Sequence, residues 1–362
     1  MSEHQGDTRR GGGAHLAHAS EQRRGHAAGE GTEGRAGGKI PKGPTELSAR
    51  SWWGALKRTF GEYKADDLSD WAAALTYYAV LSIFPAMLVL VSVIGLVGES
   101  ASRDLIDNVA DVAPGPVKQL LTSALTELQH GRAGASVAAL VGSAAALWSA
   151  SGYVAAFMRA SNVVYDVPEG RPIWKTLPLR LAVTVATLAL LSASAIAVVV
   201  TGPLADKAGH ILGLGSAAIT LWNIAKWPVL LVVISFLFAL LYWASPNVKH
   251  GFRWVTPGGV LALAVWLVAS GMFAVYVANF GSYNKTYGSI AGVIIFLVWL
   301  WITNLAILLG AELNAELERG RAIAGGHPER AEPYVQPRDT RKFDQDERDA
   351  LHDADPQSPD RQ

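Results

Sequence analysis

Two carboxylates near the end of the last apolar stretch have the types and the spacing to take part in chemistry. Glu312 and Glu316 lie four residues apart, so they share one face of a helix, and Asn304 lies two turns earlier on nearly the same face. If this face points into a helical bundle, the polar stripe can contact a substrate, a proton or a cationic loop that carries Arg159 and Arg171. If it points outward, it is a solvated helix end. The residue types leave both alternatives open.

A proline inside the first apolar stretch is the second candidate position. Pro85 follows Tyr77 and Tyr78 by about two helical turns. A proline within a helix removes a backbone hydrogen bond and kinks the helix. The kink is either tolerated, with the freed carbonyl bound by a neighbouring hydroxyl, or it marks a broken helix that lines a polar cavity, as in transporters. With Asn314, the candidate functional positions are Tyr77, Tyr78, Pro85, Arg159, Asn304, Glu312, Asn314 and Glu316.

Enzyme signatures are missing from the sequence. The chain has nine histidines and no cysteine, and only His130, His210 and His250 lie outside the polar ends, each in a separate connection. There is no HExxH sequence, no GxxxxGK[ST] phosphate-binding loop and no GxSxG nucleophile motif. The formal net charge is zero, so no general basic field exists that would attract nucleic acid. We therefore predict no catalytic residue, no cofactor, no metal and no nucleic-acid partner.

The elements that must position these residues are long apolar helices. Half of the residues are hydrophobic and only 17% are charged. Six stretches without Asp, Glu, Lys or Arg are each long enough to cross a bilayer as a helix, and period-two alternation is missing. We predict an all-α membrane protein with a bundle of six transmembrane helices over residues 71–320, with short amphipathic helices at the interfaces and disordered termini. The predicted spans are 73–98, 135–158, 179–202, 220–244, 257–279 and 287–312.

The start of the fourth span is the hardest to place. A helix that begins near Ala217 would carry the charge of Lys226 inside it. The favoured alternative is a helix from about Trp227 to Trp243, with Lys226 extending to the interface.

Segments outside the spans fall into two classes. Residues 49–70 are predicted to form an interfacial amphipathic helix, because Trp53, Leu56, Phe60 and Tyr63 recur at helical spacing beside basic residues. Two further short amphipathic helices are expected over residues 105–128, and a short outer hairpin over residues 279–287. The ends, 1–48 and 321–362, are polar and are predicted to be disordered.

Basic residues near the spans predict the orientation of the chain. They gather before the first span, in the second and fourth connections and after the last span, so both termini are expected to be cytoplasmic. These residues are Lys57, Arg58, Lys64, Arg159, Arg171, Lys175, Arg180, Lys249, Arg253, Arg319 and Arg321.

Three stretches of this sequence resemble a known family. They read ALTYYAVLSIFPAMLVLV, LYWASPNVKHGFRWVTPGG and FGSYNKTYGSIAGVIIFLVWLWITNLAILLGAELNAEL, and they are similar to the BrkB/YihY family of bacterial inner-membrane proteins over roughly residues 52–320. The resemblance implies six spans in the bacterial cytoplasmic membrane with both ends inside. Members are labelled envelope-integrity or virulence-associated proteins, and some carry the older name ribonuclease BN. The absence of a metal-binding His and Asp cluster and of a basic, aromatic-lined surface argues against nuclease activity here.

Two functions are therefore carried forward. The leading hypothesis is a non-enzymatic, multi-pass protein of the cell envelope that transports or organises a lipid or another amphiphilic molecule. The alternative is a structural or scaffolding protein of the envelope in which the polar residues only lock the helices together. The expected partners are membrane lipids, a possible second copy of the chain, and unknown proteins that bind the tails.

Overall fold

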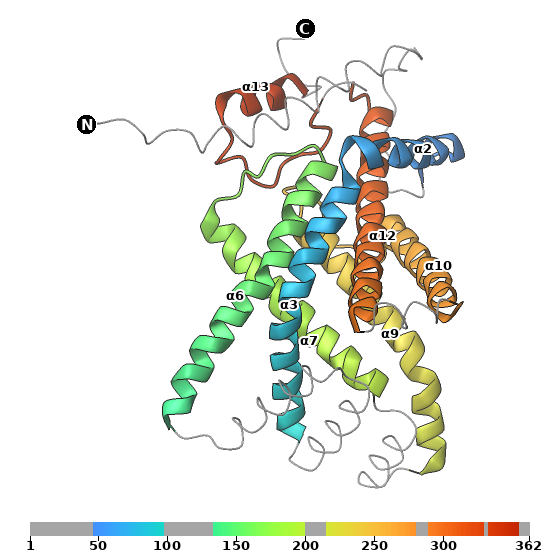
Figure 1. Ribbon diagram of the computed structural model, residues 1–362. Helices are drawn as coiled ribbons and strands as arrows, with labels where there is room; N and C mark the ends of the chain where they lie inside the picture. The colour runs from blue at the N-terminus through green and yellow to red at the C-terminus, as the bar shows by residue number, and fades with distance from the viewer. Residues whose placement is uncertain (1–45, 98–132, 200–214, 280–288, 329–331, 355–362) are drawn as a thin grey trace, which may run out of the picture.

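The described part of the fold consists of helices joined by non-helical connections. The computed structural model describes residues 46–97, 133–199, 215–279, 289–328 and 332–354. Within these ranges, six helices have more than 20 residues, and they lie where the sequence predicts them (Figure 1). They are α3 (Leu68–Val97), α6 (Ala133–Val164), α7 (Ile173–Val199), α9 (Ser216–Ala244), α10 (Pro257–Asn279) and α12 (Ser289–Ala324). Two shorter helices, α2 (Ala49–Ala65) and α13 (Gln345–Ala354), flank them.

Four of the long helices meet the length and composition of a membrane span. The matching segments are Ile173–Val198 in α7, Ala217–Ala244 in α9, Pro257–Ala278 in α10 and Ala291–Ala324 in α12. Helices α3 and α6 include residues whose side chains lie outside the described part of the structure. The prediction of a helical membrane protein is confirmed, and the number of six spans stays a prediction.

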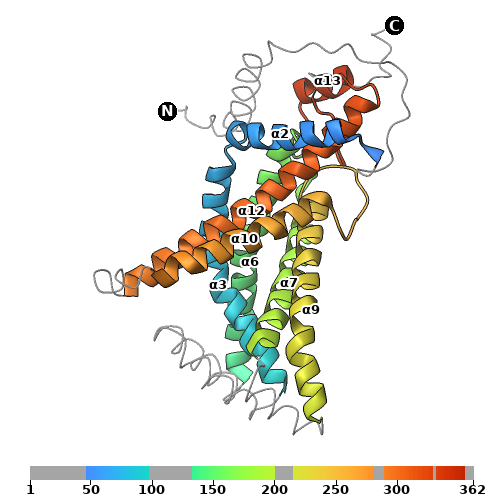
Figure 2. The same ribbon diagram turned by 90° about the vertical axis from the view of Figure 1, so that its right-hand side faces the viewer.

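The long helices form two groups that cross. In Figure 2, α3, α6, α7 and α9 run alongside one another, while the antiparallel pair α10 and α12 is tilted across them. Helix α12 packs against α10, α3 and α2. Helix α2 lies across the end of the bundle that also carries α13, and we call this the α2 end (Figures 1 and 2).

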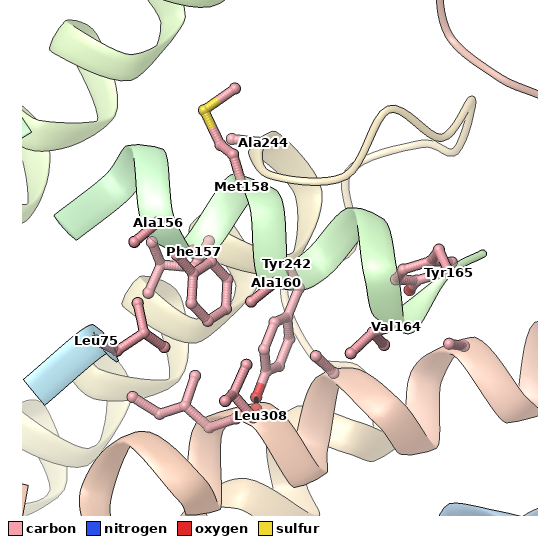
Figure 3. Close-up of a cluster of buried hydrophobic side chains, with 14 of the residues drawn as sticks. Leu75, Ala156, Phe157, Met158, Ala160, Val164, Tyr165, Tyr242, Ala244 and Leu308 are labelled. Carbon is pink, nitrogen blue, oxygen red and sulfur yellow. Dashed lines mark hydrogen bonds between the residues drawn. The ribbon is translucent and has the colours of Figure 1, made fainter. Parts of the chain in front are cut away.

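The apolar core lies in the half of the bundle nearest to α2. Phe157 of α6, Leu75 of α3 and Leu308 of α12 are fully buried there, and the Tyr242 ring of α9 points toward α12 (Figure 3). The Tyr242 hydroxyl donates to the Ile307 carbonyl at 2.7 Å, so this polar tip is satisfied within the core. Farther from α2 the helices diverge and leave apolar side chains exposed, as expected where the surrounding solvent is hydrocarbon.

Helices α10 and α12 approach each other most closely at two glycines. A Cβ atom on Gly258 would overlap the carbonyl oxygen of Gly310, and a Cβ on Gly310 would overlap the carbonyl oxygen of Gly258. Only residues without a side chain allow the two backbones to lie this close. The crossing brings the first turn of α10 next to the polar end of α12.

The predicted interfacial helix is present but shorter than expected. Helix α2 ends at Ala65 rather than near residue 70, because Asp67 adopts a positive φ of 49° and α3 begins at Leu68. Ser48 caps its N-terminus, accepting from the Ser51 backbone N–H at 3.1 Å. Trp53 and Phe60 are 70% and 69% exposed. The opposite face of α2 packs on α12, so the helix is amphipathic as predicted.

Helix α9 begins earlier than the favoured prediction. It starts at Ser216 and continues through Pro228, so Lys226 lies inside the helix rather than before it. The Lys226 ammonium donates to the Asn223 side-chain oxygen at 3.3 Å and lies 5.6 Å from the centre of the Trp227 ring. These local partners lower the cost of keeping the charge within the helix.

The predicted disordered tail from residue 321 is wrong for its described part. Helix α12 continues to Ala324, and residues 332–354, which we call the C-terminal segment, fold back onto the α2 end. Tyr334 and Phe343 are buried. Pro337 forms a β-bridge with Val248. The polar composition of this stretch predicted that the entropy lost on ordering the chain would keep it disordered. Burial of the two aromatic side chains offsets that entropy loss.

The N-terminus of helix α13 is capped by two nearby residues. Asp344 accepts from the Glu347 N–H at 2.9 Å, and Glu347 accepts from the Asp344 N–H at 3.0 Å. This reciprocal pair is a capping box. The other predictions for connecting segments, namely the tail 1–45, the amphipathic helices over 105–128 and the hairpin after Asn279, lie outside the described residues.

Candidate functional site

The polar stripe of α12 faces the interior of the bundle. Asn304 is 3% exposed, Glu312 1%, Asn314 8% and Glu316 2%. The alternative of a solvated helix end is therefore wrong. Each of the four residues lies in a different environment with different chemistry.

Asn304 joins three helices through satisfied hydrogen bonds. Its side-chain oxygen accepts from the Tyr153 hydroxyl of α6 at 2.9 Å, and its amide donates to the Thr76 hydroxyl of α3 at 3.1 Å. Thr76 in turn donates to the Ala72 carbonyl at 2.8 Å. A buried, satisfied network of this kind sets the relative positions of the helices. The geometry gives Asn304 a packing role.

Asn314 holds the start of α10. Its side-chain oxygen accepts from the Gly258 backbone N–H at 2.9 Å, and its amide donates to the Thr256 hydroxyl at 3.1 Å. The first N–H groups of a helix lack intrahelical partners, so Asn314 supplies one from a neighbouring helix. This contact reinforces the glycine crossing of α10 and α12.

Glu316 connects α12 to the helix that lies across the bundle end. It forms an ion pair with Arg58 of α2 and a second, longer one with Arg319 at 3.4 Å. Arg319 also pairs with Glu62 of α2 at 3.4 Å. Both cations are partly exposed and Glu316 is not, so the guanidinium groups compensate a buried carboxylate. Of the alternatives considered for the stripe, contact with the cationic loop of Arg159 and Arg171 is wrong for Glu316, whose cations are Arg58 and Arg319.

Glu312 differs from Glu316 although it lies only one turn away. Its Oε2 atom is buried and has no hydrogen-bond partner within the described part of the chain. Its charged neighbours include four other acidic groups, Asp66, Glu316, Glu62 and Asp166. We call these five residues the carboxylate cluster. An unpartnered buried carboxyl oxygen is costly, and intramembrane groups of this kind mark functional positions by default.

The two arginines expected near the stripe have other partners. Arg159 is exposed, and its guanidinium lies 6.0 Å from the centre of the Tyr78 ring. Tyr77 is 62% exposed and packs edge-on against Tyr78. Arg171 is buried and donates to Glu169 and to the carbonyls of Ala244 and Ser245.

Pro85 lies within α3, which continues unbroken to Val97. A broken helix at this position is therefore wrong. The side chain of Pro85 lies outside the described part of the structure.

A group of residues that the sequence reasoning missed holds the C-terminal segment in place. Asn247 is fully buried and donates to the carbonyls of Pro168 at 3.0 Å and Asp339 at 2.8 Å, while its side-chain oxygen accepts from the Asp339 N–H at 3.1 Å. Lys175 pairs with the Asp339 carboxylate at 2.9 Å. The SPN tripeptide directly after an apolar stretch was the available signal, because an Asn there has backbone groups to bind.

Charge at this junction is compensated locally. Hydrogen bonds from Lys175 and Arg341 hold the pKa of Asp339 well below its usual range. Burial raises the pKa of Glu169, but the hydrogen bonds and charge of Arg171 outweigh it, and the net pKa is lowered. Burial also lowers the pKa of His250, whose ring stacks on Tyr165. These groups form a structural junction rather than a reactive site.

Comparison with known proteins identifies the family. The profile of the family described as Virulence factor BrkB matches residues 59–334. The chain is 29% identical over 273 residues to a ribonuclease-like protein, YfkH, of Bacillus subtilis, covering 75% of this chain and 98% of the relative. It is 30% identical over 290 residues to a UPF0761 membrane protein of Halorhodospira halophila, covering 74% of this chain and 59% of the relative. A UPF0761 membrane protein of Aromatoleum aromaticum is 27% identical, with 75% and 66% covered.

The chain thus spans nearly all of the first relative but less than two thirds of the two UPF0761 proteins. No solved structure matches it. The matched region contains α3 to α12, the carboxylate cluster and the start of the C-terminal segment. This helical chain, with its apolar helices and buried carboxylates, belongs to the BrkB family of membrane proteins.

Proposed function

We propose that this protein is a multi-pass protein of the bacterial cytoplasmic membrane that transports or organises a lipid or another amphiphilic molecule for the cell envelope. The observation that carries the proposal is the ion pair between Arg58 of α2 and the buried Glu316 of α12. It links a helix with an exposed aromatic face to carboxylates inside the bundle. A lipid that moves α2 therefore changes the surroundings of these carboxylates.

The outward face of α2 has the composition of a lipid-binding surface. Trp53, Lys57, Phe60 and Lys64 are exposed and follow one another at steps of three and four residues. Aromatic rings enter the boundary between headgroups and acyl chains, and lysines reach anionic headgroups. The amphiphile that fits this face carries a negatively charged headgroup.

The charge distribution supports a cytoplasmic position for the α2 end. Basic residues gather at this end of the described helices, among them Lys57, Arg171, Lys175, Lys249 and Arg321. Excess Lys and Arg near the ends of spans favours the cytoplasmic side. We place both termini there.

Reconstitution into liposomes tests lipid movement. Purified full-length protein is inserted into vesicles that contain anionic lipid and a fluorescent lipid analogue, and the fraction of analogue accessible to a membrane-impermeant quencher is followed with time. We expect faster exchange between leaflets than in empty vesicles and a several-fold loss in Arg58→Gln. Arg348→Gln, an exposed change on α13, serves as the matched control. Equal rates in protein-containing and empty vesicles would contradict transport.

Scaffolding is the second candidate function, and the satisfied bonds of Asn304 and Asn314 favour it. Because the C-terminal segment packs on the bundle, the informative truncation removes only residues 1–45 and 355–362. If partners are recruited through these ends, the truncated protein fails to restore envelope integrity in a null strain. Full restoration contradicts recruitment through the ends.

We also propose that the chain is not an enzyme, although one relative is named ribonuclease-like. Assays with purified protein, structured RNA and added divalent cations test this point. RNA cleavage that follows the protein through purification and disappears with chelator would overturn it.

A further inference from the structure

The buried carboxyl of Glu312 has one oxygen that the proposed function does not explain. The residue is 1% exposed, and its Oε2 atom has no hydrogen-bond partner among the residues that the structure describes. Leu308, Ala311 and Ala315 of the same helix are buried with it. Apolar surroundings favour the neutral form of a carboxyl group.

Charged groups face Glu312 from several elements. Helix α2 provides Glu62 and Arg58, and the turn before α3 provides Asp66. The residues after α6 provide Tyr165 and Asp166, and the C-terminal segment provides Tyr334. Helix α12 itself provides Glu316 and Arg319. In the first turn of α3 the only charged side chain described is that of Asp70, which is exposed. Helix α10 contains no Asp, Glu, Lys, Arg or His.

The two cations of this environment are engaged elsewhere. Arg58 binds Glu316, and Arg319 is shared between Glu316 and Glu62. An ionised Glu312 would therefore stand among four other acidic groups without a guanidinium of its own. Like charges at close range disfavour ionisation of one member of the group.

We infer that Glu312 is a proton-binding site, at which one carboxyl oxygen takes up a proton from water and releases it to water. A proton needs no coordination shell, and the described residues contain no group of three or more His, Asp or Glu placed to hold a metal ion. Release of the proton adds a negative charge beside Glu316 and Asp66.

This inference does not depend on lipid transport, since a chain that moves no lipid still binds the proton. It is tested by infrared difference spectroscopy of the full chain in lipid nanodiscs. At about pH 7.5 exposed carboxyl groups and those with a moderately raised pKa are ionised, so a protonated-carboxyl band then reports a strongly buried acid. We expect one such band in the unmodified protein, its absence in Glu312→Gln and its retention in Asp346→Asn, an exposed control on α13.

Raising the pH tests proton release. We expect the band to disappear reversibly as the pH is raised, and a band that persists up to the highest pH at which the protein stays folded shows a permanently neutral carboxyl and overturns exchange. Absence of the band in the unmodified protein, or its persistence in Glu312→Gln, overturns the assignment.

A second variant keeps the test decisive if Glu312→Gln does not assemble. Asp66→Asn removes one neighbouring negative charge, so the band should disappear at a lower pH than in the unmodified protein. An unchanged midpoint overturns the inference that the carboxylate cluster controls the proton.

Discussion

Replacing Asn247 with alanine should release the C-terminal segment from the bundle. The Asn247 side chain is fully buried and makes three hydrogen bonds, two of them to the backbone of Asp339 and one to Pro168. Its own backbone carbonyl accepts from the Arg338 N–H at 2.8 Å, and this bond survives the substitution. The change therefore removes side-chain bonds while the neighbouring β-bridge can still form.

The magnitude follows from the number of bonds. Each intramolecular hydrogen bond contributes about 1 kcal/mol net, and more when the partner is left buried and unsatisfied. Three bonds give about 3 kcal/mol in favour of the undocked segment. Since 1.4 kcal/mol is a factor of ten, the undocked population should rise about 100-fold.

Hydrogen exchange measures that population at defined amides. The Asp339 and Arg338 N–H groups bind Asn247, and the Lys249 N–H binds the Gln336 carbonyl at 2.8 Å. In Asn247→Ala these amides should exchange about 100-fold faster wherever exchange proceeds through undocking. Gln336→Ala, at an exposed position of the same segment, should leave the rates unchanged. Equal exchange in Asn247→Ala and the unmodified protein would refute the reasoning.

Three further outcomes are expected. Gly310→Val should lower the thermal midpoint and separate α10 from α12, at a cost of at least about 2 kcal/mol. Gly271→Val is the control and should not lower the midpoint, because a Cβ there has no atom of another element within 4 Å. Equal midpoints in the two variants would contradict the close crossing. Because the folded-state pKa of Asp339 lies below its unfolded value, its stabilisation should be complete above about pH 4 and be lost as pH falls through the folded-state value. Melting curves of Asp339→Asn should lack this acid dependence, and parallel curves in both proteins would rule it out. Asn304→Leu removes one hydrogen-bond partner from the Tyr153 hydroxyl and one from the Thr76 hydroxyl. It should destabilise the bundle by about 2 kcal/mol, measured as a lower melting midpoint. An unchanged midpoint would mean that this network does not hold the helices together.

Properties that depend on local composition could be predicted from the sequence. The six long helices lie at the predicted stretches, because apolar runs of about 20 residues form helices wherever the backbone must satisfy its own hydrogen bonds. The amphipathic character of α2 was also predicted from the sequence. The inward direction of the α12 stripe was one of two alternatives that the sequence left open. Family membership was predicted from three stretches that resemble the family, and the matched region confirms it.

Other features depend on residues that are distant in the sequence. Composition marked residues 332–354 as a tail, but Asn247 binds Asp339 across 92 positions and Pro168 across 79.

The clearest division is between Glu312 and Glu316. By sequence they are equivalent carboxylates on one helix face. In the fold, Arg58 reaches Glu316 from 258 positions away, while Oε2 of Glu312 lies buried without a partner among the described residues. Helical periodicity is local, so the order of the residues is enough to place these acids on one helix face. Which of them a cation neutralises depends on where α2 crosses the end of the bundle, and that follows from the packing of helices far apart in the chain.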